Sequence, residues 1–152
     1  MELLPREGRD MAHSIRLRGP WEIEVMGRWV RGEGGEWKLE GEALPAGGKI
    51  EMLGSFGSVL GEDFSGRVRL RRRFHTPTGL GESSKVWLVV EAVDGAAEVA
   101  LNGVELGVIS PGQSHARFDV AAALTGQNVL EITVTSEEGR GGGLGLVRLE
   151  IE

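Results

Sequence analysis

Apolar and polar residues alternate along most of the chain, as they do in a β-strand with one buried face. In residues 21–25, Trp21, Ile23 and Val25 occupy every second position, and the acids Glu22 and Glu24 lie between them. Because successive side chains of a strand point to opposite faces of a sheet, this order places three apolar side chains together on one face. The pattern predicts a strand that packs this face against a core.

Similar segments follow at short intervals, and glycine-rich turns separate them. We expect strands at residues 15–18, 21–25, 67–74, 85–93, 98–101, 104–109, 116–120, 128–135 and 146–151. Segment 85–93 is apolar on both faces, which is typical of a central strand. Asn102 and Gly103 both tolerate positive φ, so they indicate a tight hairpin turn. Eight or nine short strands of this kind predict an all-β domain, either a sandwich or a barrel.

The rest of the chain adds little regular structure to this prediction. Segment 121–127 is the only plausible helical turn, and the glycine-rich segment 139–145 is expected to be a flexible loop. Residues 1–12 have no strand pattern, so we expect them to be irregular. No linker or internal repeat divides the sequence, and we therefore expect a single domain over residues 1–152.

The charge balance and the absence of cysteine exclude several classes of function. The chain has 17 Lys+Arg against 23 Asp+Glu, a formal net charge of -6. Nucleic-acid binding and attachment to anionic membranes both depend on a basic surface, so we expect neither. No apolar run approaches the length of a transmembrane helix, and no signal peptide is recognised at the start. With no cysteine, catalytic thiols and disulfides are excluded, while the cellular compartment stays open.

Several residues follow one another along the chain in an order that is typical of a known family. They are Trp21, Arg73-Phe74, Val93-Asp94, Leu101-Asn102-Gly103, Phe118-Asp119-Val120, Gly126 and Asn128. This order resembles the sugar-binding domain at the N-terminus of family 2 glycoside hydrolases, such as β-galactosidases and β-glucuronidases. The resemblance covers about residues 15–151 and is strongest over 86–134. It implies a galactose-binding-domain-like jelly-roll β-sandwich of two antiparallel sheets.

The same resemblance implies a module without catalytic activity of its own. In this family the catalytic acid and nucleophile lie on a following (β/α)₈ barrel of about 250 residues. We therefore expect a carbohydrate-binding or accessory module. The alternative is a structural or protein-interaction sandwich that has lost sugar binding and contacts a protein partner or a second copy. This alternative is kept because Phe64-Ser65-Gly66 replaces the family's usual Trp-Tyr pair and the chain has no tyrosine.

Two tryptophans are the first candidates for contact with a sugar. Trp29 and Trp37 flank the loop at 31–36, and sugars bind by stacking their C–H faces on aromatic rings. The competing interpretation, which we favour, is packing at the edge of a sheet. Trp21 and Trp87 lie within predicted strands, and we expect both to be buried.

Arginines crowd the strand at 67–74. Arg67, Arg69, Arg71 and Arg73 share one face, which we expect to be solvated and answered by acids on a neighbouring strand. Arg72 falls on the apolar face and needs a partner there, because an unpaired buried charge is costly. We prefer a carboxylate partner, and a polar ligand between the sheets is the alternative.

Three further polar residues complete the candidates. Asn102 and His115 are considered for ligand contact, although a purely structural turn is the favoured reading of Asn102. No cofactor is expected, and a structural calcium ion at Asp119 is a weak alternative because calcium needs 6–8 oxygen ligands. For Asp119 we favour a hydrogen-bonded cap on the following turn.

Overall fold

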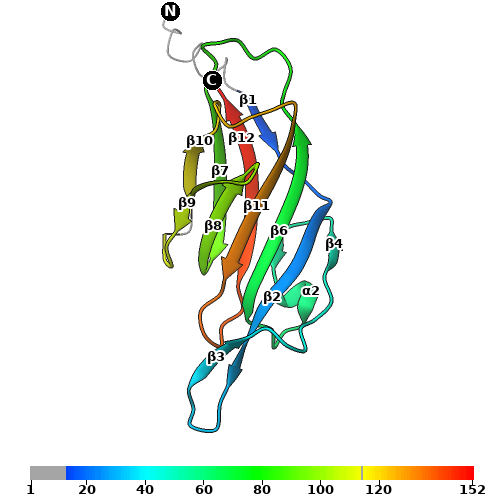
Figure 1. Ribbon diagram of the computed structural model, residues 1–152, viewed down its shortest axis with the longest axis vertical. Helices are drawn as coiled ribbons and strands as arrows, with labels where there is room; N and C mark the ends of the chain where they lie inside the picture. Colours follow the sequence, from blue (N-terminus) through cyan, green and yellow to red (C-terminus); the bar gives the residue numbers. More distant parts are fainter. Residues whose placement is uncertain (1–12, 114) are drawn as a thin grey trace, which may run out of the picture.

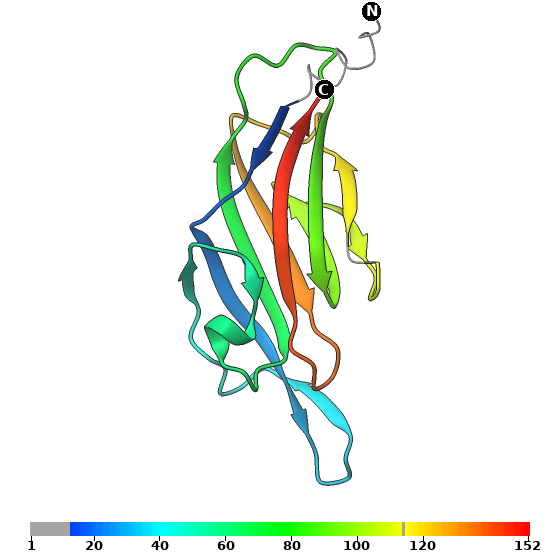
Figure 2. The same ribbon diagram turned by 180° about the vertical axis from the view of Figure 1, so that it is seen from behind.

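The computed structural model describes residues 13–113 and 115–152, so the expectation for residues 1–12 lies outside the described part. Two antiparallel sheets face each other as a β-sandwich, which confirms the predicted fold class (Figures 1 and 2). The first sheet has the order β1 (His13–Arg16), β12 (Gly143–Ile151), β7 (Val86–Asp94) and β10 (Ala116–Asp119), and β5 (Gly54–Ser55) also pairs with β12. The second sheet has the order β3 (Trp37–Glu40), β2 (Trp21–Arg31), β6 (Gly66–His75), β11 (Gln127–Thr135), β8 (Ala96–Leu101) and β9 (Val104–Ile109), with β4 (Gly48–Ile50) paired to β2.

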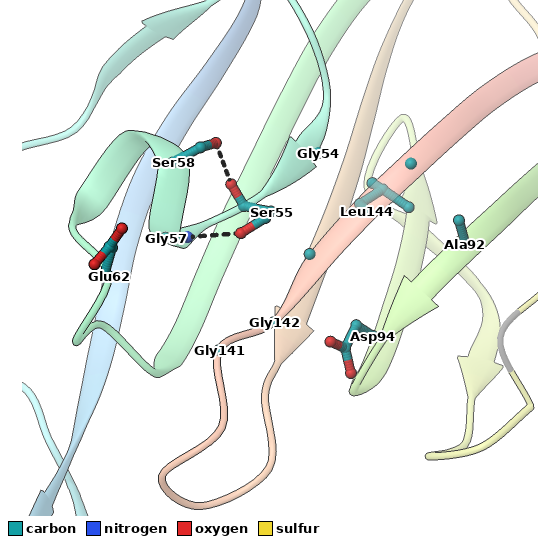
Figure 3. A pocket seen from close by; sticks show the side chains of 12 residues that line it. Gly54, Ser55, Gly57, Ser58, Glu62, Ala92, Asp94, Gly141, Gly142 and Leu144 are labelled. Carbon is teal, nitrogen blue, oxygen red and sulfur yellow. Dashed lines mark hydrogen bonds between the residues drawn. The ribbon is translucent and has the colours of Figure 1, made fainter.

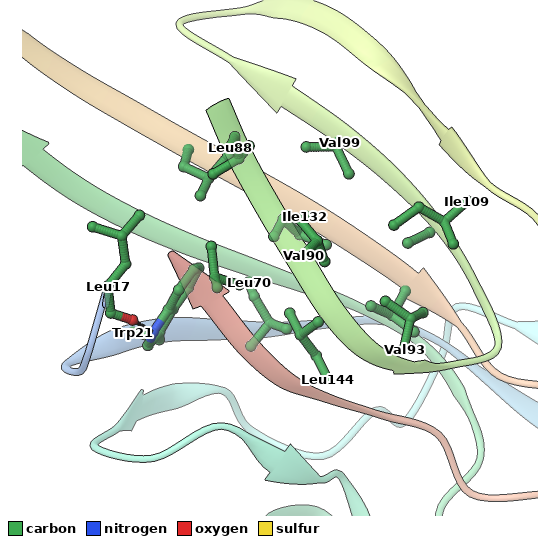
Figure 4. Packing of buried hydrophobic residues seen from close by; sticks show 14 of the residues in the cluster. Leu17, Trp21, Leu70, Leu88, Val90, Val93, Val99, Ile109, Ile132 and Leu144 are labelled. Atoms are coloured by element: carbon green, nitrogen blue, oxygen red, sulfur yellow. Dashed lines mark hydrogen bonds between the residues drawn. The ribbon is translucent and has the colours of Figure 1, made fainter. Parts of the chain in front are cut away.

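The core fills the space between the two sheets (Figure 4). The predicted alternation in β2 is confirmed, because Trp21, Ile23 and Val25 are buried while Glu22 and Glu24 are exposed. Full burial of side chains of this size stabilises a fold by roughly 1.5–3 kcal/mol each. The indole N–H of Trp21 donates to the carbonyl of Leu17 at 3.2 Å, so the largest core side chain leaves no polar atom unpaired.

The segment between residues 37 and 66 contains structure that the sequence pattern does not predict. Strands β3, β4 and β5 are short, and a single-turn helix, α2 (Gly57–Leu60), follows them. Elements of two to four residues are too short to show a period, and glycine interrupts most of them. In segment 121–127, where we expected a helical turn, residues 121–123 form a turn and Gln127 already belongs to β11. None of the described helices is long and apolar enough to cross a membrane.

The outer face of the second sheet carries the arginine stripe of β6, and neighbouring strands supply acids as predicted. Arg71 pairs with Glu131 of β11 at 2.6 Å, and Arg69 pairs with Glu24 of β2 at 3.4 Å. The hydrogen bond with Glu131 raises the pKa of Arg71 above its ordinary value, which keeps the guanidinium charged. The stripe is therefore a cross-strand charge ladder.

The outer face of the first sheet corrects one prediction. Trp87 is half-buried and not fully buried, because it projects from β7 away from the core, between the buried Val86 and Leu88 of the opposite face. Arg117 of β10 lies over the indole at 4.2 Å from the ring centroid, a cation–π contact. The indole nitrogen itself is shielded from solvent and has no hydrogen-bond partner among the described residues.

Candidate ligand-binding site

An open cavity of about 760 Å³ lies at one end of the first sheet, where three segments distant in sequence meet. One is β5 with the following helix α2, the second is the end of β7, and the third is the glycine-rich start of β12 (Figure 3). We call this cavity the glycine pocket. Its lining consists of Gly54, Ser55, Gly57, Ser58, Glu62, Ala92, Asp94, Gly141, Gly142, Gly143, Leu144 and Gly145.

Glycine is required here because the backbones approach each other closely. A Cβ atom on Gly143 would lie 2.7 Å from the carbonyl oxygen of Gly54, and one on Gly142 would lie 2.9 Å from the carbonyl oxygen of Asp94. Both distances are shorter than a side chain can accept. Residues 142 and 143 therefore fit beside β5 and β7 only without side chains. As a result the pocket presents bare backbone in its lining, where a ligand can approach peptide groups directly.

The polar side chains of the pocket come from its two walls. Ser55 and Ser58 lie on the α2 side, where the backbone N–H of Gly57 donates to Ser55 Oγ at 3.2 Å and Ser58 Oγ donates to the carbonyl of Ser55 at 2.6 Å. Glu62 lies on the same side, and Asp94 ends β7 on the other (Figure 3). Asp94 pairs with Arg140 at 3.5 Å, and both side chains are largely exposed, so the pair is weak.

The chemistry of this lining favours ligands that carry several hydroxyl groups. Serine hydroxyls, carboxylates and peptide groups donate to or accept from hydroxyls, and the charged side chains of the lining are the two carboxylates of Glu62 and Asp94. No aromatic side chain belongs to the lining. Among the described residues, no group of three or more His, Cys, Asp or Glu side chains is arranged to hold a metal ion.

Comparison with known families agrees with the order of the strands. Residues 66–142 match the family described as glycosyl hydrolase 2 galactose-binding domain-like, and this range is just over half of the chain. The chain belongs to this family. The resemblance that the sequence motifs indicate is thereby confirmed. Of the residues that line the glycine pocket, the matched range contains Ala92, Asp94, Gly141 and Gly142. No curated protein sequence matches the chain.

Solved structures of larger enzymes contain the same fold as this galactose-binding-like domain. An FMN-binding β-glucuronidase from Faecalibacterium prausnitzii L2-6 superposes with a TM-score of 0.69 at 20% identity, over 93% of this chain and 22% of that one. A β-glucuronidase from Bifidobacterium dentium gives 0.68 at 20% identity, over 93% and 30%, and a rhamnosidase from Novosphingobium sp. PP1Y gives 0.68 at 23% identity, over 93% and 15%. The chain therefore spans less than a third of each of these proteins and resembles their N-terminal domain.

The two tryptophan candidates of this galactose-binding-like domain lie outside the glycine pocket. Both belong to strands of the β2–β3 hairpin and flank the loop that joins them. Trp29 donates its indole N–H to the carbonyl of Ser136 at 2.8 Å. The ring of Trp37 covers Gly139 so closely that a Cβ there would meet it at 2.7 Å. Both rings thus pack against the loop that leads from β11 into the pocket segment of β12.

Arg72 also contacts backbone, where we preferred a carboxylate. Its guanidinium donates to the carbonyl oxygens of Arg18 and Arg73, and no ion pair within the described residues includes it. The side chain is half-buried in β6, between the buried Leu70 and Phe74 of the same face. Carbonyl dipoles and water are enough to satisfy a guanidinium in such a position.

The side chain of Asn102 makes hydrogen bonds within the fold at both ends of its amide. It has φ 53° in the hairpin turn with Gly103, as predicted. Its Nδ2 donates to the carbonyl of Ala123 at 2.9 Å and to Oδ1 of Asn128 at 3.0 Å, and its Oδ1 accepts from the N–H of Val129 at 2.8 Å. These bonds occupy both ends of the amide and fasten the β8–β9 hairpin to β11 and to the turn before it.

The last two candidates, Asp119 at the end of β10 and His115 just before this strand, do not line the glycine pocket. Asp119 Oδ1 accepts from the N–H of Ala121 at 3.2 Å, which is the predicted cap on the following turn. His115 is exposed, and the hydrogen bonds given for it involve its backbone and Gln113. Neither residue lines a cavity with the other candidates.

Proposed function

We propose that this domain is a non-catalytic carbohydrate-binding or accessory module and that the glycine pocket receives the sugar. One observation carries the proposal: a cavity of about 760 Å³, within the usual size range of small-ligand pockets, opens on peptide groups, two serines and two carboxylates. Membership of the galactose-binding-like family supports it. The pocket offers donors and acceptors for hydroxyl groups, while the sandwich supplies a rigid frame behind them.

The non-catalytic part of the proposal rests on the size and openness of the domain. Glycoside hydrolysis needs two carboxyl groups held on either side of the scissile bond, one of them with a raised pKa. Glu62 and Asp94 lie at the rim of an open cavity, and the side chain of Asp94 is 47% exposed and paired with Arg140. The chain matches only a part of the hydrolases that contain this fold. The pocket therefore fits the recognition of a sugar better than its cleavage.

A glycan array followed by calorimetric titration tests the proposal. We expect the purified protein to bind at least one neutral glycan with saturable affinity. Ser58→Ala and Glu62→Gln remove polar groups from the pocket wall, and each should weaken binding by about tenfold, the effect of losing one hydrogen bond to a charged or hydroxyl partner. Both side chains lie away from the core, so the variants should melt at the temperature of the wild type.

Glu24→Gln, on the outer face of the second sheet, is the matched control and should bind like the wild type. A blank array from folded protein would overturn sugar binding by this domain. Hydrolysis of an aryl glycoside that disappears in Asp94→Asn or Glu62→Gln would overturn its non-catalytic character.

A second candidate function, self-association or binding of a protein partner, is favoured by the edge strand β9. Val104 and Val108 on this strand are each 58% exposed, and β9 is the last strand of the second sheet. An exposed apolar edge is a template for pairing with another strand. Light scattering at increasing protein concentration would detect a dimer, which Val104→Lys with Val108→Lys should dissociate and Glu105→Lys should weaken less. A monomer at every concentration excludes pairing between copies.

A further inference from the structure

The open edge of the first sheet has a gap between two strands. Strand β12 pairs with β5 at Gly143 and Leu144, and with β1 from Arg148 to Ile151. Between them the N–H of Leu17 donates to the carbonyl of Val147 at 2.9 Å, but no residue of the described part is paired with Gly145. Figure 2 shows β1 and β5 on the same side of β12 with this interval between them. The peptide of Gly145 is thus available to a bound molecule.

A second cavity, of about 610 Å³, lies at this gap and touches the glycine pocket only at Gly145. We call it the edge groove. Its deepest side chains are apolar and belong to the core: Leu17, Trp21 and Val147 are each at most 5% exposed. The half-buried Leu53 and Leu146 and the 80% exposed Met52 complete its apolar lining.

The rim of the edge groove is basic, although the protein as a whole is acidic. Arg16 and Arg18 both belong to the lining, and Glu51 is the one carboxylate there. Arg16 on β1 lies opposite Arg148 on β12, so Arg148 is a third arginine beside this edge. Arg148 is neutralised by Glu91 and Glu150, whereas the ion pairs among the described residues do not include Arg16 or Arg18.

We propose that the edge groove is a second binding site, which takes a small apolar molecule carrying one acidic group. The apolar body would lie on Leu17, Leu53 and Leu146 under the side chain of Met52, and the acid would face Arg16 and Arg18. Arginine matches the planar geometry of a carboxylate or sulfonate, and the volume is that of a small-molecule site. This proposal is independent of sugar binding in the glycine pocket.

A matched pair of fluorescent probes separates the two parts of the site. 8-Anilinonaphthalene-1-sulfonate has an aromatic body with one acidic group, and N-phenyl-1-naphthylamine has the same body without it. We expect the sulfonate to bind at one site per chain. Arg16→Gln with Arg18→Gln should weaken the sulfonate by about tenfold, as expected for lost charge-assisted hydrogen bonds, and change the neutral probe by less than about twofold. Met52→Ser should weaken both probes by several-fold, because it removes apolar contact area.

Arg67→Gln with Arg69→Gln, on the outer face of the second sheet, is the control with the same change of net charge, and both probes should bind it as they bind the wild type. Thermal melting of every variant separates lost binding from lost fold. The proposal is overturned if folded protein does not bind the sulfonate, or if the two double variants weaken it equally. Competition of 2-naphthoic acid for the sulfonate site would extend the result to carboxylates, and failure to compete would limit the site to sulfonates and overturn the broader class.

Discussion

The buried amide of Asn128 holds one end of the sandwich together, and its removal should be costly. Asn128 is 1% exposed. Its Oδ1 accepts from the N–H of Thr125 at 2.8 Å and from Nδ2 of Asn102 at 3.0 Å, and its Nδ2 donates to the carbonyl of Phe74 at 3.3 Å and to Oγ1 of Thr76 at 2.9 Å. One side chain therefore connects the β8–β9 hairpin, the end of β6 and the segment before β11.

The size of the loss follows from the groups that Asn128→Ala would leave without partners. A buried polar group without its hydrogen bond costs about 1–3 kcal/mol, and net values for a single bond are near 1 kcal/mol. Most of the partners of Asn128 are only partly buried and can recover a bond to water. We therefore expect the substitution to lower the free energy of unfolding by about 3 kcal/mol, out of about 5–15 kcal/mol for a typical domain.

Urea denaturation followed by tryptophan fluorescence measures this difference. The midpoint should fall while the slope of the free energy against urea stays unchanged, since the surface exposed on unfolding hardly changes. The neighbouring Gln127→Ala, at an exposed position of the same strand, is the matched control and should change stability by less than about 0.5 kcal/mol. A loss below about 1 kcal/mol for Asn128→Ala, or an equal loss for both variants, would refute the structural role of this amide network.

Three other substitutions probe the framework around the glycine pocket and the charge ladder. Trp29→Phe removes the indole bond to Ser136 and should cost about 1 kcal/mol by urea denaturation; an unchanged midpoint would mean that the bond contributes nothing. Gly143→Ala places a methyl group against the β5 backbone and should cost about 1–3 kcal/mol, and a variant as stable as the wild type would show that β5 moves freely. Glu131→Gln breaks the ion pair with Arg71 and should cost at most about 1 kcal/mol, less at high salt; a salt-independent loss would contradict its electrostatic origin.

The sequence predicts the long strands well because each of them has one face in the core. In β12, the burial of Val147, Leu149 and Ile151 requires apolar residues at every second position, and the two charged residues between them are the outward ones. The hairpin turn at 102–103 can also be predicted from the sequence, because its positive φ values restrict the residue types that it accepts. Strands β3, β4 and β5 are too short for such a pattern to stand out: β3 alternates only over the four residues WKLE, and β4 and β5 have three and two residues.

The glycine pocket could not be predicted in the same way, because close approaches between the backbones of distant segments shape it. The run at 141–145 reads as a flexible loop in the sequence, yet from Gly143 onward it is a strand. Its glycines are set by tertiary contacts with Gly54 and Asp94, which lie far away along the chain. The only sequence signal is the density of glycine itself, which distinguishes a close backbone approach from a mobile linker only when the partner segments are known.

Trp29 and Trp37 do not line the glycine pocket, but they contact the loop that leads into it. Trp29 and Trp37 both hold the loop that enters β12, the first by a hydrogen bond to Ser136 and the second by covering Gly139. Two residues further along, the same loop becomes the wall of the glycine pocket. The loop that the two tryptophans flank in the sequence, at 31–36, does not line the glycine pocket, so their place in the sequence does not point to this cavity. Support of this kind helps to fix the glycine-rich wall of the pocket, because residues 141–143 have no side chains of their own.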